Sequence, residues 1–321
     1  MSVAVIGQGF VGGSLTSVLA ERNEKVFVFD KAGTVATGGN YKFIESNGDE
    51  FLPKSIQDFV QKCEQQKEFS GIYFVCVPTP MMPDGRADTR IVESVLSEIS
   101  RTPFNFDSPE RIAVIKSTVP PGSTEKWNET YGCRGLHVIF CPEFLTEANA
   151  LNDMREQTRI VLGGPRPWIN AVKMIFQRSF PKVAIVKTSS TTAEVIKYMT
   201  NCFLAVKVSF ANEVSQICEG LDSRGLNVDY DKVVEYAKMD ARLGSSHWSV
   251  PGSVPIDSGR FVRGWGGHCF PKDINAFMNV ANEVGVKPTV MMAAWEKNLE
   301  VRGPQDRDWE KQIGRAVSEE E

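Results

Sequence analysis

The sequence predicts an α/β fold in which a Rossmann-type, doubly wound parallel sheet is followed by an all-α central domain built on one long helix. Three observations predict it. The short apolar run SVAVI ends directly in the glycine-rich turn GQGFVG. Further apolar runs without strict alternation are separated by helical stretches as far as residue 188, which is typical of strands buried on both faces. The segment after residue 188 continues for about thirty residues without Gly or Pro.

The first domain, residues 1–188, contains the predicted strands. Residues 2–6 form the first strand, GSLTSVLAERN forms a helix, and KVFVFD at residues 25–30 forms the second strand, which completes a strand–turn–helix–strand unit. Helical stretches such as ADTRIVESVLSEIS separate the later strands. Five more buried strands are predicted, at residues 71–77, 111–117, 136–141, 159–164 and 182–187.

The second domain, residues 189–300, begins with the long helix. Apolar residues recur at helical spacing around much of its circumference, so it needs partners on several sides. We expect it to form a homodimer through residues 190–220. Shorter helices are predicted at residues 227–242 and 272–285, and residues 301–321 are expected to be a polar, frayed tail.

The composition excludes several classes of function. Apolar content of 42%, charged content of 24% and a net charge of −4 are ordinary for a globular protein and give no electrostatic reason to bind nucleic acid or an anionic membrane. No apolar run is long enough to span a membrane, and the N-terminus lacks the apolar region of a signal peptide. Seven irregularly spaced cysteines, without metal-ligand spacing, indicate a reducing, cytoplasmic environment and no metal site.

The turn GQGFVG has the pattern of a dinucleotide site. Gly7 makes the tight turn, Gly9 lets the backbone approach a pyrophosphate, and Gly12 lets the helix pack closely on the strand. Asp30, at the end of the next strand, is placed to accept hydrogen bonds from an adenosine ribose, which favours NAD over NADP. Lys31 beside it would tolerate a 2′-phosphate.

Five further motifs follow in a fixed order along the chain. They are VPTP (77–80) with DGRAD, KSTVPPGST, CPEFLTEANALNDMREQTRIVLGG, AEVIKYMTNCFLAVK, and GGHCFPKD at residues 266–273. In this order and spacing the chain resembles the UDP-glucose/GDP-mannose dehydrogenase family over most of residues 1–300. The resemblance implies that two NAD per turnover oxidise the C6 alcohol of a nucleotide sugar to a carboxylate.

Cys269 is the candidate nucleophile of such a four-electron oxidation. A thiolate would capture the intermediate aldehyde as a thiohemiacetal, and loss of hydride would then give a thioester that water can hydrolyse. Loop glycines before Cys269 and the nearby Lys272 suit an accessible thiolate, although a buried packing role stays open. Burial is the expected role of five other cysteines, Cys63, Cys76, Cys133, Cys202 and Cys218.

Lys197 and Asn201 are four residues apart in the long helix and therefore share one face. The resemblance implies that they stabilise oxyanion character at C6 and order the substrate; a snorkelling lysine and a capped amide are the alternative. It also assigns Asp273 to positioning a catalytic water and Glu143 to activating water for thioester hydrolysis.

The resemblance implies two further sets of contacts. The cofactor would contact Gly7, Gly9, Phe10, Val11, Gly12, Asp30, Lys31, Val77, Pro78, Thr79, Thr118 and Glu147. The substrate would contact Glu143, Phe144, Leu145, Lys197, Asn201, Gly266, Gly267 and Cys269. Thr118 is also the candidate that contacts the water network, with a plain turn as its alternative, and Glu147 has a solvated surface as its alternative.

The chain departs from the family pattern at several positions. Cys141 stands where the family usually has asparagine, and Ala148 where it has glycine. His268 is similar to the branch that acts on N-acetylated hexosamines, whereas the following FPKD is similar to the glucose branch, for which UDP-glucose is the expected substrate. His268 would either tune the neighbouring thiol or satisfy a backbone group.

Only some fifty residues follow Cys269, so most of the family's C-terminal nucleotide-binding domain is expected to be lacking. Either a compact version binds its substrate with fewer contacts, or another chain supplies the rest. Two other functions stay open. One is a two-electron β-hydroxyacid-type dehydrogenase, and the other is a catalytically silent protein that binds NAD or a nucleotide sugar.

Overall fold

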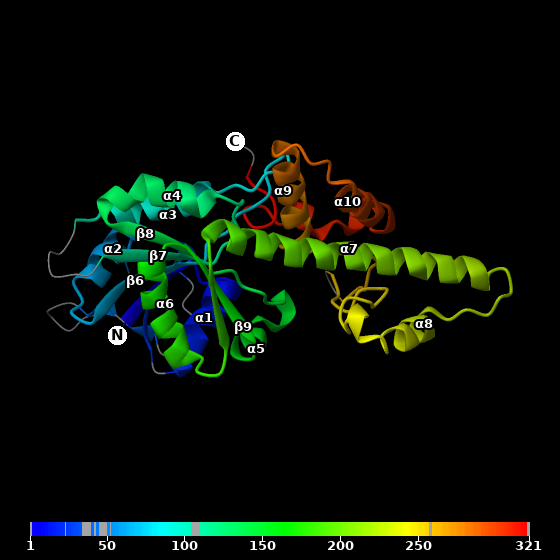
Figure 1. Cartoon of the computed structure of the whole chain (residues 1–321), viewed down its shortest axis with the longest axis horizontal. Helices are drawn as coiled ribbons and strands as arrows, with labels where there is room; N and C mark the ends of the chain where they lie inside the picture. Colours follow the sequence, from blue (N-terminus) through cyan, green and yellow to red (C-terminus); the bar gives the residue numbers. More distant parts are fainter. Residues whose placement is uncertain are drawn as a thin grey trace. The chain divides into compact units, whose positions relative to one another are not determined.

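The computed structural model describes residues 2–22, 24–33, 40–41, 43–44, 50–51, 53–103, 110–256 and 259–319. They form two compact units (Figure 1). The first comprises residues 1–79 and 89–197, and the second comprises residues 80–88 and 198–321. The division falls inside the long helix, so each unit is described by itself.

The first unit contains the predicted doubly wound sheet. The strand order of this sheet is β10-β9-β8-β7-β6-β1-β2-β3. Neighbouring strands are parallel, except that β8 and β9 are antiparallel. The strands are β1 (Ser2–Ile6), β2 (Lys25–Phe29), β3 (Asn40–Tyr41), β6 (Phe69–Val75), β7 (Arg111–Ile115), β8 (Leu136–Phe140), β9 (Arg159–Gly163) and β10 (Ala184–Thr188). A separate antiparallel pair consists of β4 (Phe43–Ile44) and β5 (Glu50–Phe51). The fold class is confirmed, and each predicted strand is present within about two residues. The predicted burial of the strand at residues 182–187 is wrong, because β10 is the edge strand of the sheet and none of its residues is buried.

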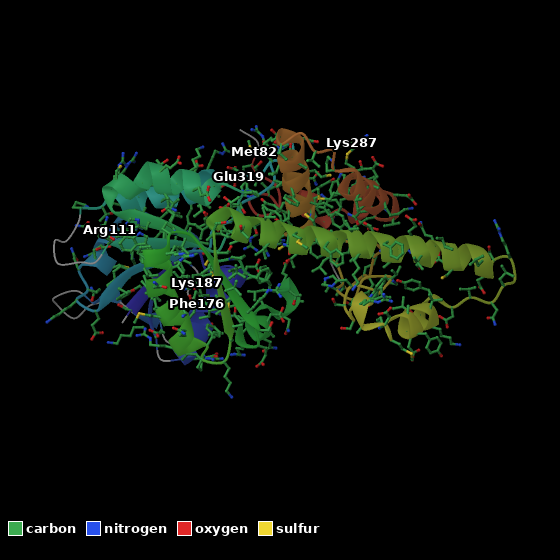
Figure 2. All side chains as sticks on the ribbon, viewed as in Figure 1. Met82, Arg111, Phe176, Lys187, Lys287 and Glu319 are labelled. Atoms are coloured by element: carbon green, nitrogen blue, oxygen red, sulfur yellow. The ribbon has the colours of Figure 1, made fainter. Side chains whose placement is uncertain are left out.

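Helices cover both faces of this sheet (Figure 1). One apolar cluster joins the sheet to α2 (Ile56–Glu64), α3 (Arg90–Arg101) and α4 (Ser123–Tyr131). The other cluster joins it to α1 (Phe10–Glu21), α5 (Ala150–Arg155) and α6 (Arg166–Ser179). Figure 2 labels Phe176 of α6, whose ring centroid lies 5.7 Å from that of Phe74 in β6. An apolar layer therefore packs on each face of the sheet.

The strand order reverses between β1 and β6. β1 is followed in the chain by β2 on one side, whereas β6 lies on its other side. In such sheets the crevice beyond the carboxyl ends of these two strands is where ligands bind. Gly7 directly follows β1, and Cys76 directly follows β6.

The second unit is helical apart from its loops. It contains the later part of α7 (Ser190–Asp222), followed by α8 (Tyr230–Ala237), α9 (Phe270–Glu283), α10 (Thr289–Val301) and the short 3₁₀ turns η3 (Ala241–Leu243), η4 (Pro304–Asp306) and η5 (Asp308–Lys311). A small apolar core joins α7, α9 and α10. It consists of Cys202, Ala205, Val208, Trp265, Ile274 and Ala294. The helix predicted at residues 227–242 is shorter, because Asp240 accepts the backbone N–H of Arg242 and starts a new turn.

The expected frayed tail is wrong for residues 302–318. Trp309 is only 2% exposed, and its ring centroid lies 5.8 Å from that of Trp295. The polar composition of the segment concealed its buried residues, of which Trp309 is the largest. Among the helices in the described ranges, none combines the length and the apolar character needed to cross a membrane.

Candidate active site

The glycine turn after β1 has the geometry that a dinucleotide requires. Gly7 has φ +91, and a Cβ there would lie 2.5 Å from the Cys76 carbonyl oxygen. A Cβ on Gly12 would lie 1.8 Å from the Gly7 carbonyl oxygen. At Gly9, by contrast, no described atom lies within 4 Å of an added Cβ. The first and third glycines therefore permit packing, whereas Gly9 leaves the backbone open at the N-terminus of α1, where a pyrophosphate would bind.

Asp30 ties the end of β2 to this turn. One carboxylate oxygen accepts the Gln8 N–H at 2.6 Å, and the other accepts the Ala32 N–H at 2.8 Å. The carboxylate is thus held beside the turn, as recognition of an adenosine ribose requires. Lys31 follows it on the exposed surface, and Phe10 and Val11 begin α1 at the open turn. These residues fit NAD.

The carboxyl ends of β6 and β7 carry the next predicted cofactor contacts. Val77, Pro78 and Thr79 follow β6, and the Ser117 hydroxyl donates to the Val77 carbonyl oxygen at 2.6 Å. Thr118 follows Ser117 and is buried. The two segments are therefore joined next to the crevice at the strand-order reversal.

Glu143 and Lys197 form a buried ion pair in the first unit. The Lys197 Nζ lies 2.7 Å from Glu143 Oε1 and donates to the Glu143 carbonyl oxygen at 2.8 Å, while the Leu145 N–H donates to Oε2 at 2.6 Å. Burial alone would raise the pKa of Glu143, but the Lys197 ammonium and these hydrogen bonds outweigh it and hold the pKa below its ordinary value. The carboxylate is therefore ionised at neutral pH and can act as a base.

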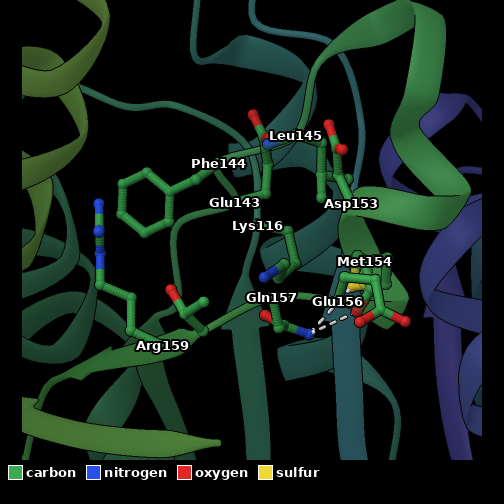
Figure 3. A pocket seen from close by; sticks show the side chains of 10 residues that line it. Lys116, Glu143, Phe144, Leu145, Asp153, Met154, Glu156, Gln157 and Arg159 are labelled. Carbon is green, nitrogen blue, oxygen red and sulfur yellow. Dashed lines mark hydrogen bonds between the residues drawn. The ribbon is translucent and has the colours of Figure 1, made fainter. Parts of the chain in front are cut away.

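A cavity of about 300 Å³ adjoins the segment Glu143–Leu145 in the same unit. Figure 3 shows Phe144 and Arg159 on one side of it, with Lys116 between them and Asp153. The Arg159 guanidinium lies 4.4 Å from the Phe144 ring centroid. Stacking on this cation fixes the Phe144 ring, which a flexible loop alone would not do.

Lys116 is a buried cation that the sequence motifs did not single out. Its Nζ donates to Cys141 Sγ at 3.4 Å and to the Pro142 carbonyl oxygen at 3.3 Å. Cys141 thus occupies the family's asparagine position as a buried partner of a lysine. Glu147, on the 3₁₀ turn η2 (Glu147–Asn149), is exposed.

The second unit holds another buried polar cluster. The Asn201 side-chain amide donates to Asp273 Oδ2 at 2.6 Å, and the Lys272 Nζ lies 2.5 Å from Asp273 Oδ1. Asp273 is only 1% exposed, so both of its oxygens are engaged away from bulk water. Because α7 is continuous, Lys197 and Asn201 lie one helical turn apart along it.

Cys269 is the N-cap residue of α9 and is half-exposed. Its carbonyl oxygen accepts the Asp273 N–H at 2.9 Å, which starts the helix. The N-terminal end of a helix dipole favours a thiolate. Lys272 was expected to supply that charge, but it pairs with Asp273 instead. The position of Cys269 at the helix N-terminus is therefore the feature of its surroundings that would favour a thiolate.

The other cysteines differ from Cys269 in their surroundings. Cys63, Cys202 and Cys218 are buried as predicted. Cys76 is only partly buried, and loss of hydration still raises the pKa of its thiol to about 12. The prediction for Cys133 is wrong, because this residue lies exposed on the 3₁₀ turn η1 (Gly132–Arg134). The raised pKa of Cys76 does not suit a nucleophile. Cys133 does not suit one either, because it lies outside the polar cluster of Asn201 and Asp273.

Comparison with known proteins decides the family. Residues 1–179 match the family model described as the NAD-binding domain of the UDP-glucose/GDP-mannose dehydrogenase family, and residues 191–300 match its central domain. The chain belongs to this family. Its first domain is therefore the NAD-binding domain of the UDP-glucose/GDP-mannose dehydrogenases, as the glycine turn and Asp30 indicate.

Individual relatives agree with this family. The chain is 30% identical over 310 residues to the putative UDP-glucose 6-dehydrogenase YtcA of Bacillus subtilis, covering 93% of this chain and 67% of that one. A UDP-glucose dehydrogenase structure from Pyrobaculum islandicum is 27% identical with a TM-score of 0.70, covering 93% and 68% of the two chains. Mycobacterium tuberculosis 3-hydroxyisobutyrate dehydrogenase, 15% identical with a TM-score of 0.66 over 95% of both chains, shares the fold. The chain spans about two-thirds of the length of the family relatives it matches.

Proposed function

We propose that this chain is an NAD-dependent dehydrogenase that oxidises the C6 alcohol of a nucleotide sugar to a carboxylate, with UDP-glucose as the first substrate to test. The observation that carries the proposal is the partly exposed Cys269 at the N-terminus of α9, one turn before the buried Asp273–Asn201 pair. A two-electron alcohol oxidation needs no such thiol. The relatives named as UDP-glucose 6-dehydrogenases favour the same substrate.

The proposed chemistry begins with formation of the aldehyde, in which the C6 hydroxyl gives its proton to water while C6 loses hydride. NAD, when bound, accepts the hydride that leaves C6 in each of the two oxidations. The Cys269 thiolate then attacks the aldehyde carbon, and the carbonyl oxygen takes a proton, which gives a thiohemiacetal. When that hydroxyl later loses its proton and C6 loses hydride, the product is a thioester on Cys269. Lys197 and Asn201 donate hydrogen bonds to the oxygen at C6 while it carries negative charge.

Hydrolysis of the thioester is assigned to Glu143. Its ionised carboxylate takes a proton from water, the resulting hydroxide attacks the thioester carbon, and the Cys269 thiolate leaves. The neighbouring Lys197 ammonium, 2.7 Å from Oε1, stabilises the negative charge on the oxygen of the tetrahedral intermediate. Asp273 and Thr118 position the water, and Phe144, Leu145, Gly266 and Gly267 contact the sugar. A reducing, cytoplasmic location would keep the thiol of Cys269 competent.

The test compares the wild type with Cys269→Ser in the presence of UDP-glucose and NAD. We expect two NADH per sugar from the wild type and loss of the second oxidation in the variant. Cys133→Ser is the matched control, because its thiol is exposed and lies in the other unit. One NADH per substrate in the wild type, with an unaltered rate after Cys269→Ser, would instead favour a two-electron dehydrogenase.

The proposal includes a homodimer through α7. Phe203, Phe210 and Ile217 are more than half exposed and lie seven residues apart, so they form one apolar stripe. In an antiparallel pair of helices centred on Phe210, Phe203 of one copy would meet Ile217 of the other. The same symmetry would place Lys207 opposite Glu213. The stripe is thus self-complementary in both apolar contact and charge, which favours a second copy of this chain.

A further inference from the structure

The turn that precedes Cys269 is held by residues 302–318, which we call the 302–318 strap. The Gly267 N–H donates to Asp308 Oδ2 at 3.0 Å. Asp308 Oδ1 lies 3.0 Å from a guanidinium nitrogen of Arg302, whose side chain is 4% exposed. A Cβ on Gly266 would lie 2.1 Å from Asp308 Oδ1 and 2.8 Å from Arg302. Only glycine therefore fits at position 266, next to the ion pair of Arg302 and Asp308.

The strap is anchored well beyond this one contact. Arg302 also donates to the Asp306 carbonyl oxygen at 2.8 Å, and its guanidinium lies 5.7 Å from the Trp309 ring centroid. A row of neighbouring rings runs from the strap to the residue after Cys269. Ring centroids are 5.8 Å apart for Trp309 and Trp295, 5.5 Å for Trp295 and Trp265, and 6.2 Å for Trp265 and Phe270.

The far end of the strap pairs with the loop that follows VPTP. The Met81 N–H donates to the Ala316 carbonyl oxygen at 2.8 Å, and the Ser318 N–H donates to the Met81 carbonyl oxygen at 2.9 Å. One segment thus contacts both the turn before Cys269 and the chain directly after a predicted cofactor motif. The strap itself follows the segment that matches the family's central domain, residues 191–300.

We propose that Asp308, held by Arg302, is a positioning residue for Cys269: it tethers the Gly266–Gly267 turn and thereby fixes the thiol at the N-terminus of α9. The catalytic consequence rests on the proposed function, whereas the tether itself does not. A thiol that must meet C6 in two successive steps needs a fixed location, since small displacements cost large factors in rate. Because Gly267 has no side chain, only its backbone groups can bind Asp308, and its N–H is the group that does so.

The first test measures Cys269 alkylation by iodoacetamide in the protein without substrate or NAD, followed by peptide mass spectrometry. In Asp308→Ala we expect alkylation about fivefold faster, because the turn opens more often when its hydrogen bond is lost. Asp308→Asn removes the charge but keeps an oxygen that accepts the Gly267 N–H, so its rate should stay near the wild type. Equal acceleration in both variants would mean that charge acts rather than the tether, and would overturn the proposal.

A matched control removes a different contact of the same strap. Arg260→Ala breaks the ion pair of Arg260 with Asp306, 2.6 Å apart, without touching the Gly266–Gly267 turn, so alkylation of Cys269 should not change. In turnover, Asp308→Ala should lower kcat about tenfold or more with an unchanged KM for NAD, and Asp308→Asn should recover most of it. Wild-type kcat in Asp308→Ala would overturn the positioning role. If the wild type oxidises no sugar, the proposed function fails, while alkylation still judges the tether.

Discussion

Replacing Glu143 by glutamine separates the last chemical step from the earlier ones. Glutamine has nearly the same shape and its amide oxygen can still accept from Lys197, but it cannot take a proton from water. Loss of a general base lowers the rate of the assisted step by about 10²–10⁴-fold. Both oxidations precede thioester hydrolysis, so they should continue for one turnover. The sugar should then remain on Cys269.

Intact-mass spectrometry of Glu143→Gln, quenched in acid during turnover, should therefore show a covalent adduct, with a burst of about two NADH per active site. The double variant with Cys269→Ser is the control and should carry no adduct. A steady state without adduct, in a variant that turns over slowly, would remove Glu143 from hydrolysis. It would point to an earlier role, such as placing Lys197.

The same substitution also has a stability consequence. Lys197 is 2% exposed, and removing one partner of a buried ion pair costs about 3–5 kcal/mol. The amide keeps one hydrogen bond, so we expect the lower end, about 3 kcal/mol, or a fall in Tm of about 6–12 °C for a unit of this size. Differential scanning calorimetry without ligand measures it, and a fall below 2 °C would mean that water already reaches Lys197.

The pH dependence of that difference checks its electrostatic origin. The pKa of Glu143 is lower in the folded protein than in the unfolded chain. Its contribution to the free energy of unfolding is therefore fully present above the unfolded pKa of about 4.3 and is lost as the pH falls through the lower folded pKa. The Tm of the wild type should therefore approach that of Glu143→Gln only below about pH 4. A gap that closes between pH 6 and 7 would contradict a depressed pKa.

Two further predictions concern the cofactor turn and the dimer. Gly9→Ala should keep the wild-type Tm, because no described atom lies near the new methyl group. It should raise the Kd for NAD about tenfold, because the methyl group occupies the space of the pyrophosphate. Gly12→Ala should fail to fold, because its Cβ would lie 1.8 Å from the Gly7 carbonyl oxygen. Wild-type NAD affinity in Gly9→Ala, measured by calorimetric titration, would show that the pyrophosphate binds elsewhere. Phe210→Glu should convert a dimer to a monomer in light scattering at micromolar concentration, whereas Val284→Glu, also on an exposed apolar residue, should not. A wild type that is already monomeric would refute the dimer.

Local patterns predicted those parts of the fold that local physics determines. Apolar runs located the strands within about two residues, because a strand buried on both faces requires an unbroken apolar run. The glycine spacing predicted the turn for a similar reason, since the carbonyl oxygens of Cys76 and Gly7 leave no room for a Cβ. Burial of an isolated residue is different, because it depends on partners that are distant in sequence. Cys133 and Trp309 lie in similarly polar segments, yet the first is exposed and the second is buried.

The same limit applies to the candidate site. The four-residue spacing of Lys197 and Asn201 predicted one shared helix face, but spacing carries no information about what each side chain meets. Lys197 meets a carboxylate from residue 143, and Asn201 meets a carboxylate from residue 273, so two residues one turn apart depend on chain segments far away in both directions. Asp308 had still less signal, because an aspartate in the mostly charged stretch DRDWEK looks like solvent-exposed surface. Its proposed role follows only from the two glycines that it contacts. Gly266 and Gly267 have no side chains, so their turn can be held only through backbone groups such as the Gly267 N–H. A glycine pair before a reactive residue is therefore a reason to search the chain for a carboxylate that accepts a hydrogen bond from that turn.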